Sequence, residues 1–376
     1  MEKKTVLVAM SGGVDSSVAA ALLVEQGHTV VGVTMKTFCY QEAEAALTGP
    51  TRSCCGLDGI MDARQVADRL GIAHYVFDVE REFTRDVIDD FVGEYAAGRT
   101  PNPCVRCNGN TKFRDLLRRG KMLGCNAIAT GHYARMGADA AGRPVLLRGV
   151  DANKDQSYFL WALPPEMLPQ LVFPLGELTK PRVREIAREL GLVTADKPES
   201  MEICFVPDGN YPRFLEKRLG KEHAALAAGA LVTTSGEVIG EHDGYARYTV
   251  GQRRGLGGGR ALPLYVLGTR PERREVVVGT ADELHRPDVT IGELNWLAAP
   301  PAVGDVVQVQ IRHRAPAVAA TVDAVDGDAV TLRFARPQRA VSPGQSAVMF
   351  SGEVVLGGGR IASDESLIGE IDHGAA

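Results

Sequence analysis

The chain has 376 residues, more than one hydrophobic core usually serves, and its 45% hydrophobic content is enough for two or three domains. Its formal net charge of −5 argues against a protein that coats nucleic acid indiscriminately, since such binding depends on neutralising phosphates. The first residues lead directly into a strand pattern, and no apolar run approaches the roughly 20 residues of a membrane span, so we expect a cytoplasmic protein without a signal peptide or membrane anchor.

The first predicted element is a buried strand over residues 5–10 that ends at a glycine turn. This run is short, β-branched and apolar on both faces, as in parallel sheets covered by helices. Gly12 and Gly13 then allow a tight turn, and Asp15 and Ser16 fall where a helix N-terminus has free N–H groups. Such a turn binds anions. The alternative is a turn that only joins a strand to a helix.

The turn is neither a Walker A loop nor a Gly-x-Gly-x-x-Gly dinucleotide motif. Its sequence over residues 11–16, Ser-Gly-Gly-Val-Asp-Ser, resembles the PP-loop of enzymes that split ATP between its α and β phosphates. The resemblance implies that the loop grips the leaving pyrophosphate while AMP passes to a carbonyl or carboxylate oxygen. It does not specify the substrate.

A helix pattern over residues 14–26 and a strand pattern over residues 29–35 continue as a βαβ unit. Met35 closes that strand at its carboxyl end, where open α/β sheets bind ligands, so it is a candidate for adenine contact or a core methionine. A further helix over residues 64–70 and a strand over residues 73–79 are predicted. An odd number of cysteines, seven, argues against a disulfide framework. No role is assigned to Cys39, Cys54, Cys55 and Cys125.

Residues 98–108 contain two prolines and predict an ordered loop that leads into a helix over residues 111–119. Cys104 and Cys107 form a Cys-x-x-Cys pair at the entrance of that helix. The helix N-terminus and Arg106 would favour their thiolate forms, because positive potential lowers the pKa of a thiol. Two inert buried thiols are the alternative.

The next strand pattern, over residues 126–130, ends at Gly131 and His132. Gly131 would let a nucleotide approach the sheet, and His132 is either a substrate contact or a structural histidine. Lys154 is a candidate to neutralise phosphate charge on ATP or RNA. A helix is predicted over residues 181–190, and Cys204 follows it in an apolar run, where burial is the default unless a partner thiol lies near.

From about residue 211 the pattern changes to short strands, and the last of them predict a small antiparallel barrel. The predicted strands cover residues 230–234, 237–240, 265–267, 275–278, 306–312, 317–325, 329–334 and 347–355. Two basic clusters are either phosphate contacts or solvated faces. They are Arg114, Arg118, Arg119 and Lys121 on one helix, and Arg247, Arg253, Arg254 and Arg260 around a glycine-rich segment.

With these motifs in order along nearly the whole chain, the sequence resembles the tRNA-specific 2-thiouridylases. The resemblance includes Gly-His-Tyr-Ala-Arg at 131–135, Lys-Asp-Gln-Ser-Tyr at 154–158, Ile-Cys-Phe-Val at 203–206 and Ser-Pro-Gly-Gln at 342–345. It implies an α/β fold in three parts. These are a PP-loop domain (adenine nucleotide α hydrolase-like) with a parallel sheet over residues 1–210, a small central β-rich domain that contacts tRNA over residues 211–285, and a C-terminal antiparallel β-barrel over residues 286–376.

The resemblance also implies the site residues. Cys107 corresponds to the nucleophile and Cys204 to the residue that carries a persulfide, and Asp15 is placed with them as catalytic. The ATP pocket would consist of Ala9, Met10, Ser11, Gly12, Gly13, Val14, Asp15, Ser16, Met35 and Gly131. The tRNA would contact Asn102, Pro103, Cys104, His132, Lys154, Asp155, Gln156, Arg312, His313 and Gln345, the first three of these at the target base.

The implied reaction replaces O2 of the wobble uridine of a tRNA anticodon arm with sulfur. AMP is first placed on O2, because C2 of uridine is a poor electrophile, and sulfur from the Cys204 persulfide then attacks C2. The wobble base must leave its stack to reach the site. ATP with Mg²⁺ is the implied cosubstrate, and an upstream sulfur donor such as a cysteine desulfurase or a sulfur-relay protein is the implied partner.

One departure from the family leaves a second route open. Many members have Asp where this chain has Cys104, so Cys104, Cys107 and Cys204 provide three candidate thiolates. Three cysteines suit a [4Fe–4S] cluster whose unique iron binds hydrosulfide. Other PP-loop enzymes, such as a tRNA lysidine synthetase, a 4-thiouridine synthetase or an argininosuccinate-type ligase, fit the loop equally well, but none predicts Cys107 and Cys204 together. A sulfur carrier or RNA-binding module without catalysis would require a vestigial loop.

Overall fold

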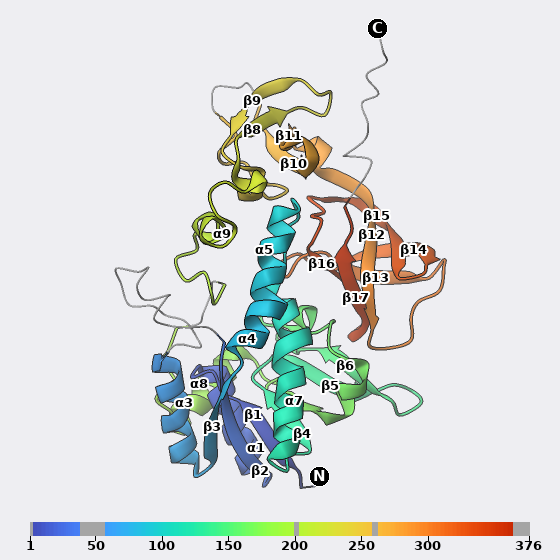
Figure 1. Ribbon diagram of the computed structural model, residues 1–376. Coiled ribbons are helices and arrows are strands. Elements are labelled where there is room, and N and C mark those ends of the chain that lie inside the picture. Colours follow the sequence, from blue (N-terminus) through green and yellow to red (C-terminus); the bar gives the residue numbers. More distant parts are fainter. Residues whose placement is uncertain (1–2, 38–56, 199–202, 258–261, 364–376) are drawn as a thin grey trace.

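The computed structural model describes residues 3–37, 57–198, 203–257 and 262–363, which form three parts (Figure 1). A five-stranded parallel sheet comes first, a four-stranded sheet follows, and an antiparallel barrel ends the described chain. The predicted α/β class and its three kinds of domain are therefore confirmed. Within the described residues, every helix is too short or too polar to cross a membrane.

The parallel sheet has the strand order β3-β2-β1-β4-β7. Its strands are β1 (Thr5–Ala9), β2 (Thr29–Lys36), β3 (Ala73–Asp78), β4 (Ala127–Thr130) and β7 (Leu171–Val172). Both faces are covered, which explains the continuous apolar run of β1. Val6 and Val8 pack toward α1 (Val14–Glu25), α3 (Leu57–Leu70) and α8 (Lys180–Glu189), and Leu7 packs toward α7 (Phe113–Met122).

Two long helices run from this sheet toward the central part, and each contains a π-helical turn. The first is α4 (Glu80–Phe83), η1 (Thr84–Ile88) and α5 (Asp89–Ala96), and the second is α6 (Pro103–Arg106), η2 (Cys107–Lys112) and α7. The π turns η1 and η2 lie side by side, where Thr111 Oγ1 donates to the Asp86 carboxylate at 3.5 Å. Such turns occur frequently at functional sites.

The second helix corrects the sequence analysis, because it begins at Pro103 and not at Thr111. Pro103 occupies the first turn, where its missing N–H would have had no intrahelical partner. The side chain of Asn102 caps the helix by accepting a hydrogen bond from Val105 N at 3.4 Å. The prediction of a loop through residue 108 gave the prolines too much weight, and Cys104 and Cys107 lie on the helix itself.

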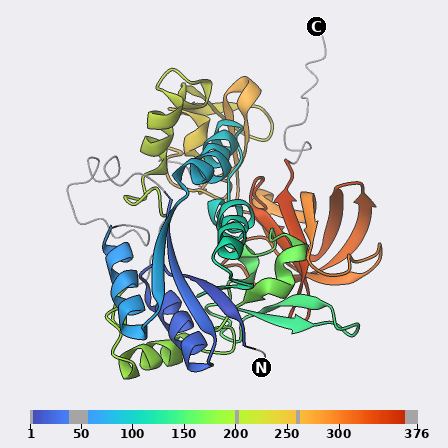
Figure 2. The same ribbon diagram turned by 60° about the horizontal axis from the view of Figure 1, so that its bottom comes forward.

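A hairpin of the N-terminal part, β5 (Ala134–Ala138) and β6 (Pro144–Arg148), is not predicted by the sequence pattern. The strand β6 pairs with β17 of the barrel, so this hairpin extends the barrel sheet. In the turned view of Figure 2 the barrel (orange to red) lies beside the N-terminal part, and the hairpin reaches it from below. The two parts are therefore joined by backbone pairing.

The central part consists of α9 (Tyr211–Leu219) and a sheet of order β10-β11-β8-β9. Its strands are β8 (Gly229–Val232), β9 (Val238–His242), β10 (Tyr265–Arg270) and β11 (Glu275–Gly279). Phe91 of α5 packs against Phe205 in the hydrophobic core of the central part, so the central part rests on the first long helix.

Short 3₁₀ turns occur throughout the described chain. They cover residues 157–159, 165–170, 224–226, 245–247, 271–273 and 282–284.

The barrel closes because its first strand pairs with both β15 and β17. Its strands are β12 (His285–Trp296), β13 (Val306–Gln310), β14 (Val318–Asp326), β15 (Ala329–Arg339), β16 (Ser346–Ser351) and β17 (Val354–Ile361). The single strand predicted over residues 347–355 is wrong. A turn at Gly352, which has a φ of +58°, divides it into β16 and β17.

Candidate functional site

The turn after β1 holds its shape through its own hydroxyl groups. Ser16 Oγ accepts a hydrogen bond from Ser11 N at 3.1 Å and donates to the carbonyl of Gly13 at 3.1 Å. Ser17 Oγ donates to the same carbonyl at 2.9 Å. Gly13 is the N-cap of α1 and brings no side chain to the N–H groups of the first turn, which can therefore face a ligand.

Glycine is required at two points around this loop. Gly12 has a φ of +70°, and a Cβ there would overlap the backbone of Gly59 in α3. A Cβ at Gly131, just after β4, would lie 2.7 Å from Ser16 N. Gly131 thus lies against the turn over residues 11–16, which we call the phosphate loop, as its assignment to the ATP pocket requires. Met10 and Met35 are both buried core residues, at 2% and 8% exposed, and Met35 ends β2 nearby.

Asp15 is held by two residues that the sequence analysis did not single out. Lys180 Nζ lies 2.7 Å from each of its carboxylate oxygens, and the Tyr133 hydroxyl donates to Oδ1 at 2.7 Å. The Lys180 side chain is 9% exposed, so its ammonium group lies largely out of water. The carboxylate of Asp15 is therefore committed to anchoring the first turn of α1.

A second lysine reaches the loop from the opposite side. Lys197 Nζ donates to the carbonyl of Gly12 at 2.9 Å and pairs with the Asp62 carboxylate at 2.5 Å. Both missed lysines directly precede a proline: Lys180-Pro181 lies in the first turn of α8, and Lys197-Pro198 lies in the loop after that helix. The Lys-Pro pair is the sequence signal that could have found them.

The two predicted sulfur residues pack on one hydrophobic cluster, although they are far apart in sequence. Cys107 at the start of η2 and Cys204 beyond α8 are both half-buried against the cluster that contains Phe83, Phe91 and Phe205. Cys104 is exposed, and Cys125 is buried, which raises the pKa of its thiol. Cys39, Cys54 and Cys55 lie outside the described residues.

Both C-terminal parts hold the segment that precedes the Cys-x-x-Cys pair. From the central part, Tyr245 Oη donates to Ala96 O at 2.7 Å and Thr269 Oγ1 donates to Gly98 O at 2.8 Å. From the barrel, Gln345 Nε2 donates to the carbonyls of Thr100 and Pro101. The loop assigned to the target base is therefore built by all three parts of the chain.

A network of ion pairs also joins the first long helix to the barrel. Arg360 of β17 pairs with Asp90 at 2.8 Å, Glu94 at 2.6 Å and Glu293 at 3.2 Å. Burial alone would raise the pKa of Glu94, but the hydrogen bond from Arg99 and the charge of Arg360 outweigh it and lower that pKa.

Arg106 belongs to the same network. It pairs with Asp90 at 3.1 Å and Glu293 at 2.8 Å. Its charge is therefore offset by two carboxylates, which weakens its expected effect on the thiol of Cys107.

The residues assigned to tRNA contact fall into two groups. Asp155 and Gln156 bind within the chain: the Asp155 carboxylate pairs with Arg148 at 2.9 Å, and Gln156 Oε1 accepts from Tyr133 N at 3.0 Å. Arg148 also approaches Gln310 Oε1 at 3.5 Å, which brings residues 154–156 near Arg312 and His313 at the barrel rim. Lys154 and Arg312 are half-buried, and His313 is exposed. The contact of these three residues with tRNA stays a prediction.

His132 stacks on Phe113 with ring centroids 5.9 Å apart, and its Nδ1 lies 2.7 Å from Thr130 Oγ1. Burial, with the charge of Lys112, lowers its pKa well below the usual value. His132 is thus a neutral ring under physiological conditions. This environment fits the structural alternative, while contact with RNA remains a prediction.

The described residues include Cys104, Cys107 and Cys204, yet no three His, Cys, Asp or Glu side chains among them are placed to hold one metal ion. The iron–sulfur alternative is therefore not favoured by the geometry.

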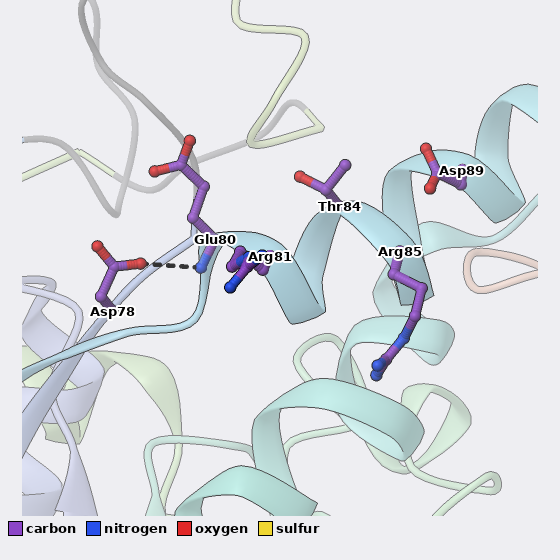
Figure 3. A pocket seen from close by; sticks show the side chains of 6 residues that line it. All are labelled: Asp78, Glu80, Arg81, Thr84, Arg85 and Asp89. Atoms are coloured by element: carbon purple, nitrogen blue, oxygen red, sulfur yellow. Dashed lines mark hydrogen bonds between the residues drawn. The ribbon is translucent and has the colours of Figure 1, made fainter.

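A separate pocket of about 480 Å³ opens at the start of α4 (Figure 3). It is lined by Asp78, Glu80, Arg81, Thr84, Arg85 and Asp89. Asp78 accepts a hydrogen bond from Glu80 N at 3.1 Å, which fixes the turn between β3 and α4. Because β2 lies between β3 and β1, this pocket is distinct from the phosphate loop.

The parallel sheet, the glycine turn and the helix that starts from it define a PP-loop-type α/β protein. Family models match the three parts: the tRNA methyl transferase HUP domain over residues 4–208, the tRNA methyl transferase PRC-barrel domain over 213–280 and the aminomethyltransferase beta-barrel domain over 286–361. The chain belongs to the family of the tRNA-specific 2-thiouridylases, as its similarity to curated members shows.

The tRNA-specific 2-thiouridylase MnmA of Geobacter metallireducens is 49% identical over 96% of this chain and 97% of its own length. The protein of the same name from Carboxydothermus hydrogenoformans is also 49% identical, over 96% and 98%. Among solved structures, a 4-thiouridine synthetase–RNA complex with bound ATP covers 58% of this chain and 51% of its own at 17% identity, with a TM-score of 0.33.

Proposed function

We propose that this chain catalyses the ATP-dependent 2-thiolation of the wobble uridine of tRNA, as a tRNA-uridine 2-sulfurtransferase of the cytoplasm. The relatives that carry this name span nearly the whole chain. The observation that carries the chemistry is that Cys107 and Cys204 pack on one hydrophobic cluster. A reaction that passes sulfur between two thiols requires that they approach each other, and packing on the same cluster is compatible with such an approach.

The first step activates the base. Uridine O2 attacks the α phosphate of ATP, the bond to the β phosphate breaks, and pyrophosphate remains on the N–H groups at the start of α1. ATP enters with Mg²⁺. The ligands of that ion would be phosphate oxygens and water, because the Asp15 carboxylate already accepts hydrogen bonds from Lys180 and Tyr133. Asp15 would then support the loop through these contacts.

The second step transfers sulfur. The terminal sulfur of a Cys204 persulfide attacks C2, AMP leaves, and the Cys107 thiolate then attacks Sγ of Cys204, which releases 2-thiouridine and leaves a Cys107–Cys204 disulfide. Alternatively, Cys107 attacks the persulfide first and frees hydrosulfide, which attacks C2. In both orders an external dithiol supplies the two electrons that reset the cysteines. A cysteine desulfurase or sulfur-relay protein would load Cys204.

The tRNA would lie across all three parts, because the central part and the barrel both hold residues 96–101, which lead into Asn102, Pro103 and Cys104. We assign Lys154, Arg312 and His313 to contacts with the anticodon arm, together with Gln345. The division into domains at residues 210 and 285 is part of this proposal.

The test is thiolation of anticodon-arm tRNA, measured by mass spectrometry of 2-thiouridine beside ATP–pyrophosphate exchange. Cys107→Ser and Cys204→Ser should lose thiolation and keep exchange, because the phosphate loop is intact in both. Cys125→Ser, a change at a buried cysteine away from the cluster, is the matched control and should keep both. Thiolation by the Cys204→Ser variant would contradict the assignment.

A further inference from the structure

The contact between Lys197 and the phosphate loop is not explained by the fold alone. Lys197 Nζ lies 2.9 Å from the carbonyl oxygen of Gly12 and 2.5 Å from a carboxylate oxygen of Asp62. The two side chains are 32% and 30% exposed. An ion pair so accessible to water contributes little to stability, so its place on the loop requires another reason.

The loop has charged pairs on both sides, and they differ in accessibility. On the side of α1, Asp15 pairs with Lys180, whose side chain is 9% exposed against 32% for Lys197, while the two carboxylates are similarly accessible. On the side of Gly12, Asp62 of α3 and Lys197 meet from two different segments, where Gly12 packs against Gly59. The first pair is fixed, whereas the second can exchange its partner.

Pyrophosphate places more negative charge on the loop than the loop can neutralise. The start of α1 supplies the equivalent of about half a positive charge, and the Asp15–Lys180 pair sums to zero. A compact ammonium group is well suited to phosphate oxygens. Lys197 can provide this charge if Asp62 releases it, and phosphate oxygens compete well for a weakly held lysine.

We propose that Lys197 binds the β and γ phosphates of ATP and retains the leaving pyrophosphate, and that Asp62 holds its ammonium group on the loop until the nucleotide arrives. Asp62 is then a positioning residue that competes with the ligand. This inference deepens the proposed function, because it rests on the use of ATP at this loop.

The experiment is calorimetric titration of the full chain with MgATP and, separately, with AMP. Lys197→Met should weaken ATP binding about tenfold or more, the effect of losing a charged hydrogen bond, and Lys197→Arg should recover most of it. AMP affinity should stay close to that of the wild type, because AMP lacks the two outer phosphates. Arg188→Met is the matched control, since Arg188 pairs with Asp196, the neighbour of Lys197, at 3.0 Å but does not contact the loop.

Asp62→Asn separates ligand binding from a structural role. Removing the competing carboxylate should tighten ATP binding, whereas a merely structural pair would lose ATP affinity in both Asp62→Asn and Lys197→Met. Equal ATP affinity in Lys197→Met and wild type, or an equal loss for AMP and ATP, would overturn the proposal. The titrations need no tRNA, so a chain that bound ATP in this way but left tRNA unmodified would contradict the proposed function alone.

Discussion

Gln345 Nε2 of the barrel lies 2.9 Å from the carbonyl oxygen of Pro101, the residue before the helix cap that precedes the cysteine pair. The same nitrogen lies 3.1 Å from the carbonyl of Thr100, so both N–H groups of the carboxamide are used. Thr100 N in turn donates to Pro343 O at 2.8 Å. The barrel therefore shapes the loop that we assign to the target base, in addition to any contact with RNA.

Gln345→Glu should uncouple this loop from the barrel. A carboxylate has the same shape but cannot donate, so two hydrogen bonds are lost at a cost of about 2 kcal/mol, and two carbonyls face a negative charge. We expect slower sulfur transfer with little change in ATP–pyrophosphate exchange. Gln338→Glu is the control, because the half-buried Gln338 also donates to barrel carbonyls, at 2.8 and 3.4 Å, but its hydrogen bonds are exposed to solvent. Unchanged thiolation in Gln345→Glu would contradict this role.

Asp15→Asn should destabilise the protein as well as slow adenylation. The change leaves the ammonium group of Lys180 without its counter-charge in a site where that side chain is 9% exposed. Breaking a buried ion pair from one side costs about 3–5 kcal/mol, and we expect the lower end because Asp15 is 32% exposed.

The companion variant is Asp15→Asn with Lys180→Met, in which both charges are absent. Denaturant unfolding should show that this double variant recovers stability relative to Asp15→Asn. If the single and double variants unfold at the same denaturant concentration, the pair does not anchor the loop.

The phosphate loop could be read from the sequence because its parts are local. An apolar strand, two glycines and a helix start follow one another within residues 5–16, and each has its own physical reason. Lys180 and Lys197 could not be found in this way, because their partners Asp15 and Gly12 lie far away in sequence. Only the packing of α8 and the loop after it brings them to the site.

For the helix that carries the cysteines, local signals were misleading. Pro101 and Pro103 predict a loop, but a proline in the first turn, such as Pro103, is compatible with a helix. The ion pair of Asp155 could not be predicted for a third reason. Its carboxylate pairs with Arg148 from a hairpin that the sequence pattern did not reveal, and the assignment of Asp155 to tRNA contact stays a prediction.

Cys104→Asp should retain thiolation. In the proposed route the exposed thiol of Cys104 takes no part in the transfer between Cys107 and Cys204, and an exposed position can accommodate a carboxylate. Iron and sulfide analysis after anaerobic purification is the companion measurement, with Cys104→Ser as a second variant. Loss of activity in both variants, together with iron and sulfide in the wild type, would restore the cluster route.

His132 should make stability depend on pH below its ordinary pKa of 6.5. Burial lowers the pKa of the folded state, so below pH 6.5 the unfolded chain binds a proton that the folded chain does not. The stabilisation is complete above that pH and is lost as the pH falls toward the folded pKa, by up to about 1.4 kcal/mol per pH unit for one proton.

His132→Asn should reduce this slope, because asparagine does not titrate. The pKa values of His74, His242 and His313 are also lowered by burial, so the quantity to compare is the difference in unfolding free energy between wild type and variant at each pH. His285→Asn, the same exchange at an exposed histidine, controls for the substitution itself. An imidazole NMR signal of His132 that titrates near pH 6.5 in the folded protein would contradict the argument, because burial would then impose no cost on its charge.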